Sequence, residues 1–122
     1  MIGIKTLPDE LSKRLERWFK ELKRVGDFRV LRCLSPSQDV VNTTLHLFCD
    51  ASENAYATVC YLRTSTSDGS VYVRQVMAKS KVAPVKAVSI PRLALLGATL
   101  STKIGPSVMG KLGVPKESVF YW

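Results

Sequence analysis

The sequence predicts a mixed α/β (α+β) fold: a three-stranded antiparallel meander, a helix and the start of a parallel fourth strand, preceded by an amphipathic helix. Three observations support this prediction. Strand-like apolar runs follow one another between residues 44 and 79, joined by short polar connections. Residues 89–104 then show helical apolar spacing, and a new apolar run begins at Val119. A strand that follows a helix normally joins its sheet by a parallel crossover.

The first predicted element is an amphipathic helix that begins near Pro8 and ends at Gly26. Its apolar side chains recur at helical spacing: Leu11, Leu15, Trp18, Phe19, Leu22 and Val25. We expect this stripe, with Trp18 and Phe19, to be buried against a core and the basic residues to face solvent. Residues 28–34 read as a short strand or an extended connector, and residues 35–43 as a loop.

The three strands are predicted at residues 44–50, 55–63 and 71–79. The second and third are joined by a polar segment that contains Asp68-Gly69, a strong hairpin turn signal. Only residues 51–54 separate the first and second strands. Two short connections in a row imply an antiparallel meander.

The helix that follows can be capped by Ser89 and carries Pro91 in its first turn. One face is apolar: Leu93, Leu96, Leu100 and Ile104. Gly105-Pro106 is expected to end it. The run at residues 119–122 is shorter than a usual strand of about five or six residues, so we expect the sequence to be cut off there.

Bulk composition limits the possible classes of protein. The 122 residues suffice for one small domain, and the net charge of +8 favours a polyanion partner such as nucleic acid, although a solvated basic surface is the alternative. Three cysteines without CxxC spacing suit a reducing compartment, and no apolar run reaches the ~18 residues of a membrane span. We therefore expect an intracellular protein, cytoplasmic or nuclear, without a membrane partner.

Asp50 is a carboxylate at the end of a predicted buried strand. Phosphodiester chemistry with two Mg²⁺ ions needs several converging carboxylates. The nearest acids, Glu53 and Asp68, lie in predicted turns, and the helix at 89–104 has no acid. Apart from Asp50, four residues on, His46 has no His, Cys or carboxylate at ligand spacing, so we expect a hydrogen-bonded or edge histidine and not a metal ligand.

Three stretches together resemble one known family: LHLFCDASENAYATVCYLR, VRQVMAKSKVAPVKAVSIPRLALLGATL and VFYW. They are similar, over about residues 8–122, to the ribonuclease-H-like region of BEL/Pao retrotransposon polyproteins, the Pao retrotransposon peptidase family region. AKSKVAP and IPRL in register with FCDAS are the most specific motifs. The resemblance implies a ribonuclease-H-like fold whose acids bind Mg²⁺ and cut the RNA strand of RNA–DNA hybrids.

Carried over by residue, the resemblance makes Asp50 the first catalytic, metal-binding acid. Ala94 stands where the family's helix has Glu, and the remaining acids would follow Trp122. We therefore expect Asp50 to be vestigial, Mg²⁺ binding to be weak or absent, and the chain to be catalytically inactive. Residues 1–42 are expected to form a helical connector, and residues 43–122 a truncated ribonuclease-H-like domain.

Four basic residues near the start of the second helix are candidate contacts to nucleic acid: Lys79, Lys81, Lys86 and Arg92. The expected partners are an RNA–DNA hybrid and the remainder of a retroelement polyprotein. A non-catalytic nucleic-acid-binding or scaffold module is the alternative function. The first hairpin turn lacks the glycines of a phosphate-binding loop, which disfavours an actin-like ATPase, and the Asp-Thr/Ser-Gly motif of an aspartic protease is missing.

Overall fold

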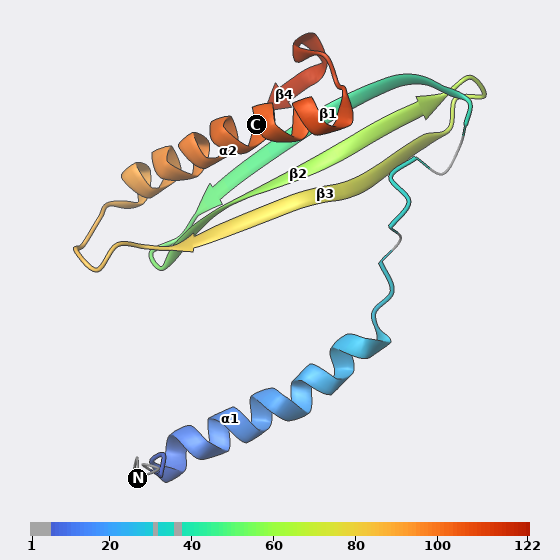
Figure 1. Ribbon diagram of the computed structural model, residues 1–122. Helices are drawn as coiled ribbons and strands as arrows, with labels where there is room; N and C mark the ends of the chain where they lie inside the picture. Colours follow the sequence, from blue (N-terminus) through green and yellow to red (C-terminus); the bar gives the residue numbers. More distant parts are fainter. Residues whose placement is uncertain (1–5, 31, 36–37) are drawn as a thin grey trace. The chain divides into compact units, whose positions relative to one another are not determined.

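The computed structural model describes residues 6–30, 32–35 and 38–122. The chain divides into two compact units, Met1–Arg32 and Cys33–Trp122, and each is described by itself (Figure 1). None of the described helices is both long enough and apolar enough to cross a membrane.

The first unit contains the helix α1 (Asp9–Leu22) and the 3-10 helix η1 (Lys23–Asp27). Acids in the first turn of α1 and Lys20 in its last turn complement the helix dipole. The prediction of a buried apolar stripe is wrong, because α1 has no buried residue and Trp18 and Phe19 are 54% and 55% exposed. The physical reason is that residues 6–30 and 32, the described part of this unit, form no sheet and no second long helix that could cover the stripe.

The second unit is a four-stranded sheet with one long helix, and its order of elements is the predicted one (Figure 1). The sheet order is β3-β2-β1-β4, with β1 antiparallel to β2, β2 antiparallel to β3, and β4 parallel to β1. The elements are β1 (Val40–Ala51), β2 (Ala55–Thr66), β3 (Val71–Val82), α2 (Ile90–Leu112), η2 (Lys116–Ser118) and β4 (Val119–Tyr121).

All three long strands extend beyond their predicted bounds, and β1 begins at Val40, inside the predicted loop. Val40 and Val41 are β-branched and favour a strand, but the polar residues around them obscure the period-2 pattern. These first residues pair with the end of β2, Val40 with Thr66 and Asn42 with Ser65. Non-local hydrogen bonds therefore decide this boundary. No strand forms in residues 28–30 or 32–34, so the described part of the segment 28–34 is a connector.

The β2–β3 turn is the predicted hairpin. Gly69 has a φ of 87°, which a residue with a side chain rarely adopts, and its N–H donates to the Thr66 carbonyl at 3.0 Å. Asp68 Oδ1 accepts hydrogen bonds from the Thr66 hydroxyl and from the Ser70 N–H. These bonds, the one from Thr66 first, lower the pKa of Asp68, because they favour its charged form.

Helix α2 continues through Gly105-Pro106 to Leu112, so the predicted end is wrong. Proline removes one helical N–H, but the apolar spacing continues beyond it to Val108, which is buried in the core. Packing of this last segment therefore outweighs the lost hydrogen bond. The helix ends at Gly113, whose left-handed φ of 66° and N–H bond to the Met109 carbonyl make a C-terminal cap.

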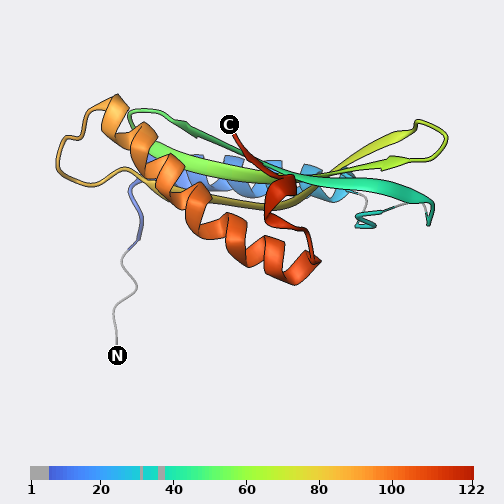
Figure 2. The ribbon, with the colours of Figure 1, turned by 90° about the horizontal axis from the view of Figure 1, so that it is seen from above.

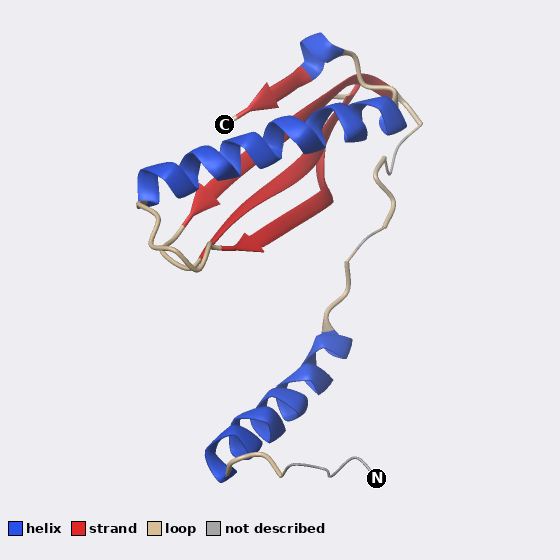
Figure 3. Cartoon of the chain, turned by 60° about the vertical axis from the view of Figure 1, so that its left-hand side comes forward, coloured by secondary structure: helices blue, strands red, loops and turns tan. Residues whose placement is uncertain are grey.

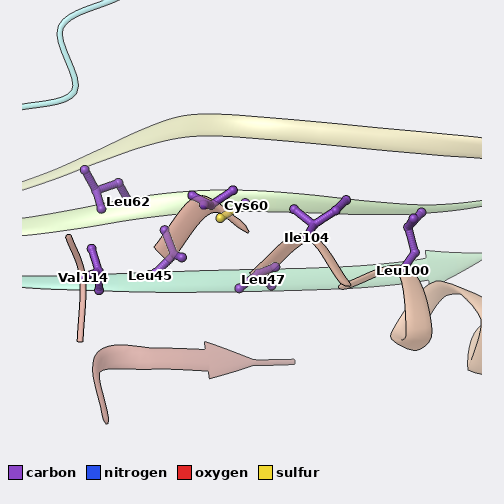
Figure 4. Close-up of a cluster of buried hydrophobic side chains, with 8 residues drawn as sticks. Leu45, Leu47, Cys60, Leu62, Leu100, Ile104 and Val114 are labelled. Atoms are coloured by element: carbon purple, nitrogen blue, oxygen red, sulfur yellow. The ribbon is translucent and has the colours of Figure 1, made fainter. Parts of the chain in front are cut away.

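The core lies between α2 and one face of the sheet, as Figures 2 and 3 show from two directions. Leu45 and Leu47 of β1 are fully buried, and each stabilises the fold by roughly 1.5–3 kcal/mol. Leu96, predicted to share the buried face of α2, is instead 36% exposed. The cluster consists of Leu45, Leu47, Cys60, Leu62, Leu100, Ile104, Val108 and Val114 (Figure 4).

The other face of the sheet, here called the open face, is made by the alternate residues of the strands. Strand pairing places His46 beside Tyr61 and Phe120, and Phe48 beside Val59. Within the described part of Cys33–Trp122, the sheet has a helix on one face only. The open face thus leaves aromatic side chains such as Phe48 about half exposed.

Candidate nucleic-acid interface

Asp50 is the penultimate residue of β1 and is exposed. Its Oδ1 accepts a hydrogen bond of 2.8 Å from the N–H of Ala51, as is usual for an Asp at a strand end. In the sheet it is level with Ala57 of β2, which in turn pairs with Ser80 of β3. The cross-strand neighbours of Asp50 therefore carry no charge.

Helix α2 approaches this end of β1 at Gly97. A Cβ added to Gly97 would lie 3.5 Å from the Asp50 carbonyl oxygen and 3.5 Å from the Cβ of Cys49. A small residue at 97 therefore allows close approach of helix and strand. Ala94 lies about one turn before Gly97, toward the same end, and it is exposed. Its methyl group has no donor atom for a metal ion.

A buried hydrogen-bond pair fixes α2 to the sheet next to this site. The hydroxyl of Thr58 donates to the Phe48 carbonyl at 3.1 Å and lies 2.5 Å from the hydroxyl of Ser101 on α2. Thr58 and Ser101 are each only 3% exposed. Since Thr58 has one hydroxyl hydrogen, Ser101 is the donor of the shared bond.

The residues at this site do not fit a pair of Mg²⁺ ions. In residues 6–30, 32–35 and 38–122, no group of three or more His, Cys, Asp or Glu side chains is arranged to hold a metal ion. Asp50 alone offers one carboxylate, whereas Mg²⁺ in such sites is held by several oxygen ligands. The chemistry that Asp50 can support here is hydrogen bonding and weak cation attraction.

The four predicted basic residues, here called the basic end, belong to the end of β3, the connection that follows it and the start of α2. Strand pairing places the end of β3 at the same end of the sheet as Asp50. Lys79 and Asp50 line one hollow of about 300 Å³, and Lys81 follows two residues further along β3. Lys86 lies in the connection to α2, and Arg92 in the first turn of α2.

All members of the basic end are exposed, and none of them has an ion pair within the described part of the chain. The fold thus places these cations at the end of the sheet where β1 ends, although they are distant from Asp50 in sequence. Exposed, unpaired cations of this kind can contact phosphate groups without reading sequence.

Sequence reasoning missed a row of rings on the open face. His46 stacks on Phe120 with ring centroids 5.2 Å apart, and the Trp122 ring lies 6.3 Å from His46 and 6.1 Å from Phe48. The period-2 alternation of β1 places His46 and Phe48 on one face, which was the available signal. Trp122 joins them only because β4 pairs with β1.

Both ring nitrogens of His46 are hydrogen-bonded, which is the hydrogen-bonded histidine that the sequence predicted. Nδ1 accepts from the Trp122 indole N–H at 3.2 Å, and Nε2 lies 2.9 Å from the Thr44 hydroxyl. Burial and then the positive charge of Arg63 lower the pKa of His46. The neutral ring is therefore the favoured form.

The chain matches the model of a protein family described as Pao retrotransposon-like RNaseH-like domain over residues 4–122. No curated protein and no solved structure matches it. The family is the one that AKSKVAP, IPRL and FCDAS indicated. Three antiparallel strands, a helix and a strand parallel to the first are the elements expected from that resemblance.

Proposed function

The chain belongs to the Pao retrotransposon-like RNaseH-like domain family, and from this premise we propose that it binds RNA–DNA hybrid through the basic end without cutting it. It would do so as part of a retroelement polyprotein in an intracellular, reducing compartment, which suits its free cysteines. The observation that carries the proposal is that four exposed, unpaired cations lie at one end of the sheet, where Lys79 and Asp50 line the same hollow.

Charge and geometry support binding to a sugar–phosphate backbone. Lys79 and Lys81 project from one strand, and Lys86 and Arg92 lie on the connection and helix that follow it. Cations spread over three neighbouring segments can contact several phosphates of one strand. Binding of this kind is largely independent of sequence and falls steeply with added salt.

Asp50 and Ala94 are the reason to expect that residues 1–122 do not cut the RNA strand of the hybrid. Hydrolysis of a phosphodiester with Mg²⁺ requires ions held firmly enough to stabilise developing charge. Mg²⁺ dehydrates reluctantly, so a lone exposed carboxylate holds it weakly. The Ala94 methyl supplies nothing further at the position where the family has a glutamate.

The binding half is tested by fluorescence anisotropy with a 16-base-pair RNA–DNA hybrid at several salt concentrations. Lys79→Gln/Lys81→Gln should weaken binding and reduce the slope of log affinity against log salt by about 1.8 for two phosphate contacts. The matched control is Lys111→Gln/Lys116→Gln, which removes the same charge at the far end of α2. Equal effects of the two double variants would show a diffuse charge effect and contradict a site at the basic end.

The catalytic half is tested by incubating the chain with labelled hybrid in 5–10 mM Mg²⁺ or Mn²⁺, a range chosen to be well above weak carboxylate affinities. We expect the RNA strand to remain intact. Metal-dependent cutting that disappears in Asp50→Asn would overturn this half of the proposal and leave the binding half standing.

A further inference from the structure

A second hollow lies on the open face and is about 370 Å³ in volume. It shares Phe48 with the hollow that Asp50 and Lys79 line, but it contains none of the residues of the basic end. Its lining combines rings, one cation and one aliphatic side chain: His46, Phe48, Tyr61, Arg63 and Val73. Such a volume falls in the range of pockets that take small organic groups, about 300–1,000 Å³. No acid contributes to this lining.

Arg63 determines which charge an occupant of the hollow must carry. The residue is half-buried on β2, level with Thr44 on one side and Val73 on the other. It has no ion-pair partner in the part of the chain that the structure describes. An occupant that covered it without an anion would leave a cation unpaired in an apolar setting, which is unfavourable.

The aromatic rings determine which shape of occupant fits the hollow. Phe48 is 43% exposed and Trp122 66% exposed, and their planes are within 11° of parallel. Tyr61 meets Phe48 edge-on, at 74° and 5.9 Å between centroids. Flat, exposed rings beside a guanidinium suit a flat aromatic group that carries an anion.

We propose that the open face binds single-stranded nucleic acid, with an unpaired base in this hollow and its phosphate on Arg63. Bases within a duplex are already stacked and paired, so only an unpaired base can enter a hollow between rings. A net charge of +8 favours a polyanion over an apolar polypeptide as the occupant. The inference extends the proposed nucleic-acid binding to a second surface and a second form of the ligand.

The test measures anisotropy with two probes, a fluorescent 12-mer of oligo(dT) and the RNA–DNA hybrid. Arg63→Gln should weaken oligo(dT) binding about tenfold, and Phe48→Leu, which keeps apolar volume but removes the ring, about fivefold. Arg63→Gln, which changes no residue of the hollow lined by Asp50 and Lys79, should leave hybrid binding within twofold. Lys79→Gln/Lys81→Gln should show the opposite pattern, so failure of either surface is recognised separately.

Two controls separate binding from folding. Tyr72→Leu removes a ring from a β3 position on the α2 side of the sheet, and Lys111→Gln removes a distant charge. Both should bind oligo(dT) within twofold of the unaltered chain. Thermal unfolding of each variant is compared first, and Arg63→Gln, which changes no apolar residue, serves where Phe48→Leu unfolds.

Unchanged oligo(dT) affinity in both Arg63→Gln and Phe48→Leu would overturn the inference. A dimer detected by light scattering and dissociated by Phe48→Leu, in a chain that does not bind oligo(dT), would also overturn it. That result would assign the open face to a second copy of the chain instead.

Discussion

His46 lies between two hydrogen bonds that its neutral ring can make together. Because Nδ1 accepts the Trp122 N–H, the ring proton is on Nε2 and points at the Thr44 hydroxyl. Protonation would place a second hydrogen on Nδ1, facing the indole N–H. The charged group facing the ring is Arg63 of β2, while β4 contributes the rings of Phe120 and Trp122.

Stability should therefore depend on pH through His46. The pKa of His46 in the folded chain lies below the ordinary histidine value of 6.5, so near and below pH 6.5 the unfolded chain binds the proton more readily than the folded one. The stabilising contribution is fully present above that pH and is lost as pH falls through the folded pKa. Urea unfolding between pH 8 and 5 should show the loss.

His46 is the single histidine of the chain, so His46→Gln is a direct control. In this variant the slope of stability against pH should flatten between about pH 6.5 and 5, a window above the usual carboxylate pKa values. An unchanged slope in His46→Gln would assign the pH effect to other groups.

Among the elements, helix α2 contains two glycines in opposite environments, one buried and one exposed. Gly105 is buried beneath Tyr121, and an added Cβ would lie 3.0 Å from Cζ of that ring. Gly110 is exposed, and an added Cβ there would meet nothing within 4 Å. The same residue type thus has a packing role at 105 and only a conformational cost at 110.

We expect Gly110→Ala to raise the free energy of unfolding by about 1 kcal/mol, because alanine favours the helix over glycine by that amount. Gly105→Ala should gain less or lose stability, because the Tyr121 ring must move. Chemical denaturation measures both changes. In a Tyr121→Leu background, Gly105→Ala should recover the gain, and no recovery would contradict the proposed clash.

A second prediction for α2 concerns its buried bond to the sheet. Thr58→Val leaves the Ser101 hydroxyl without its partner and should cost about 1–3 kcal/mol of folding free energy. Ser101→Ala should cost less, since Thr58 keeps its bond to the Phe48 carbonyl.

Removal of both hydroxyls, in Thr58→Val/Ser101→Ala, should cost less than Thr58→Val alone, because no buried donor is then orphaned. A double-mutant cycle from urea unfolding measures this coupling. Strictly additive effects would mean that the two hydroxyls do not depend on each other.

At the scale of the whole molecule, the sheet has three distinct surfaces: two faces and one end. One face is packed under α2, the open face exposes rings around Arg63, and the basic end collects cations near Asp50. The chain has 18 basic and 10 acidic residues. Its net positive charge attracts a polyanion at long range, in addition to the local contacts. Charge therefore affects the rate of encounter as well as affinity.

Association with hybrid should be steered by this attraction. Stopped-flow anisotropy should show the association rate constant falling at least tenfold between about 20 and 200 mM salt, as the Debye length shortens from about 20 Å to below 10 Å. The control replaces the added salt by an equal mass of neutral dextran, which does not screen charge. A rate constant independent of salt would indicate that encounter is limited by a conformational step instead.

The sequence by itself determined the order of elements, the Asp68-Gly69 turn and the family. These depend on local features: period-2 alternation, turn residues with special φ values, and motifs contiguous in the chain. Asp50 at the end of β1 and the four cations could be named for the same reason. The role given to each of them remains a proposal.

Tertiary structure alone decided where β1 begins, how far α2 runs and whether α1 is buried. Pairing with β2 fixes Val40, and packing of Val108 carries α2 past Pro106. Only β4 pairing brings Trp122 to His46, and only the sheet places Lys79 and Asp50 in the lining of one hollow. The physical reason is that periodicity shows which residues share a face, whereas distant contacts determine what covers that face and which ends meet.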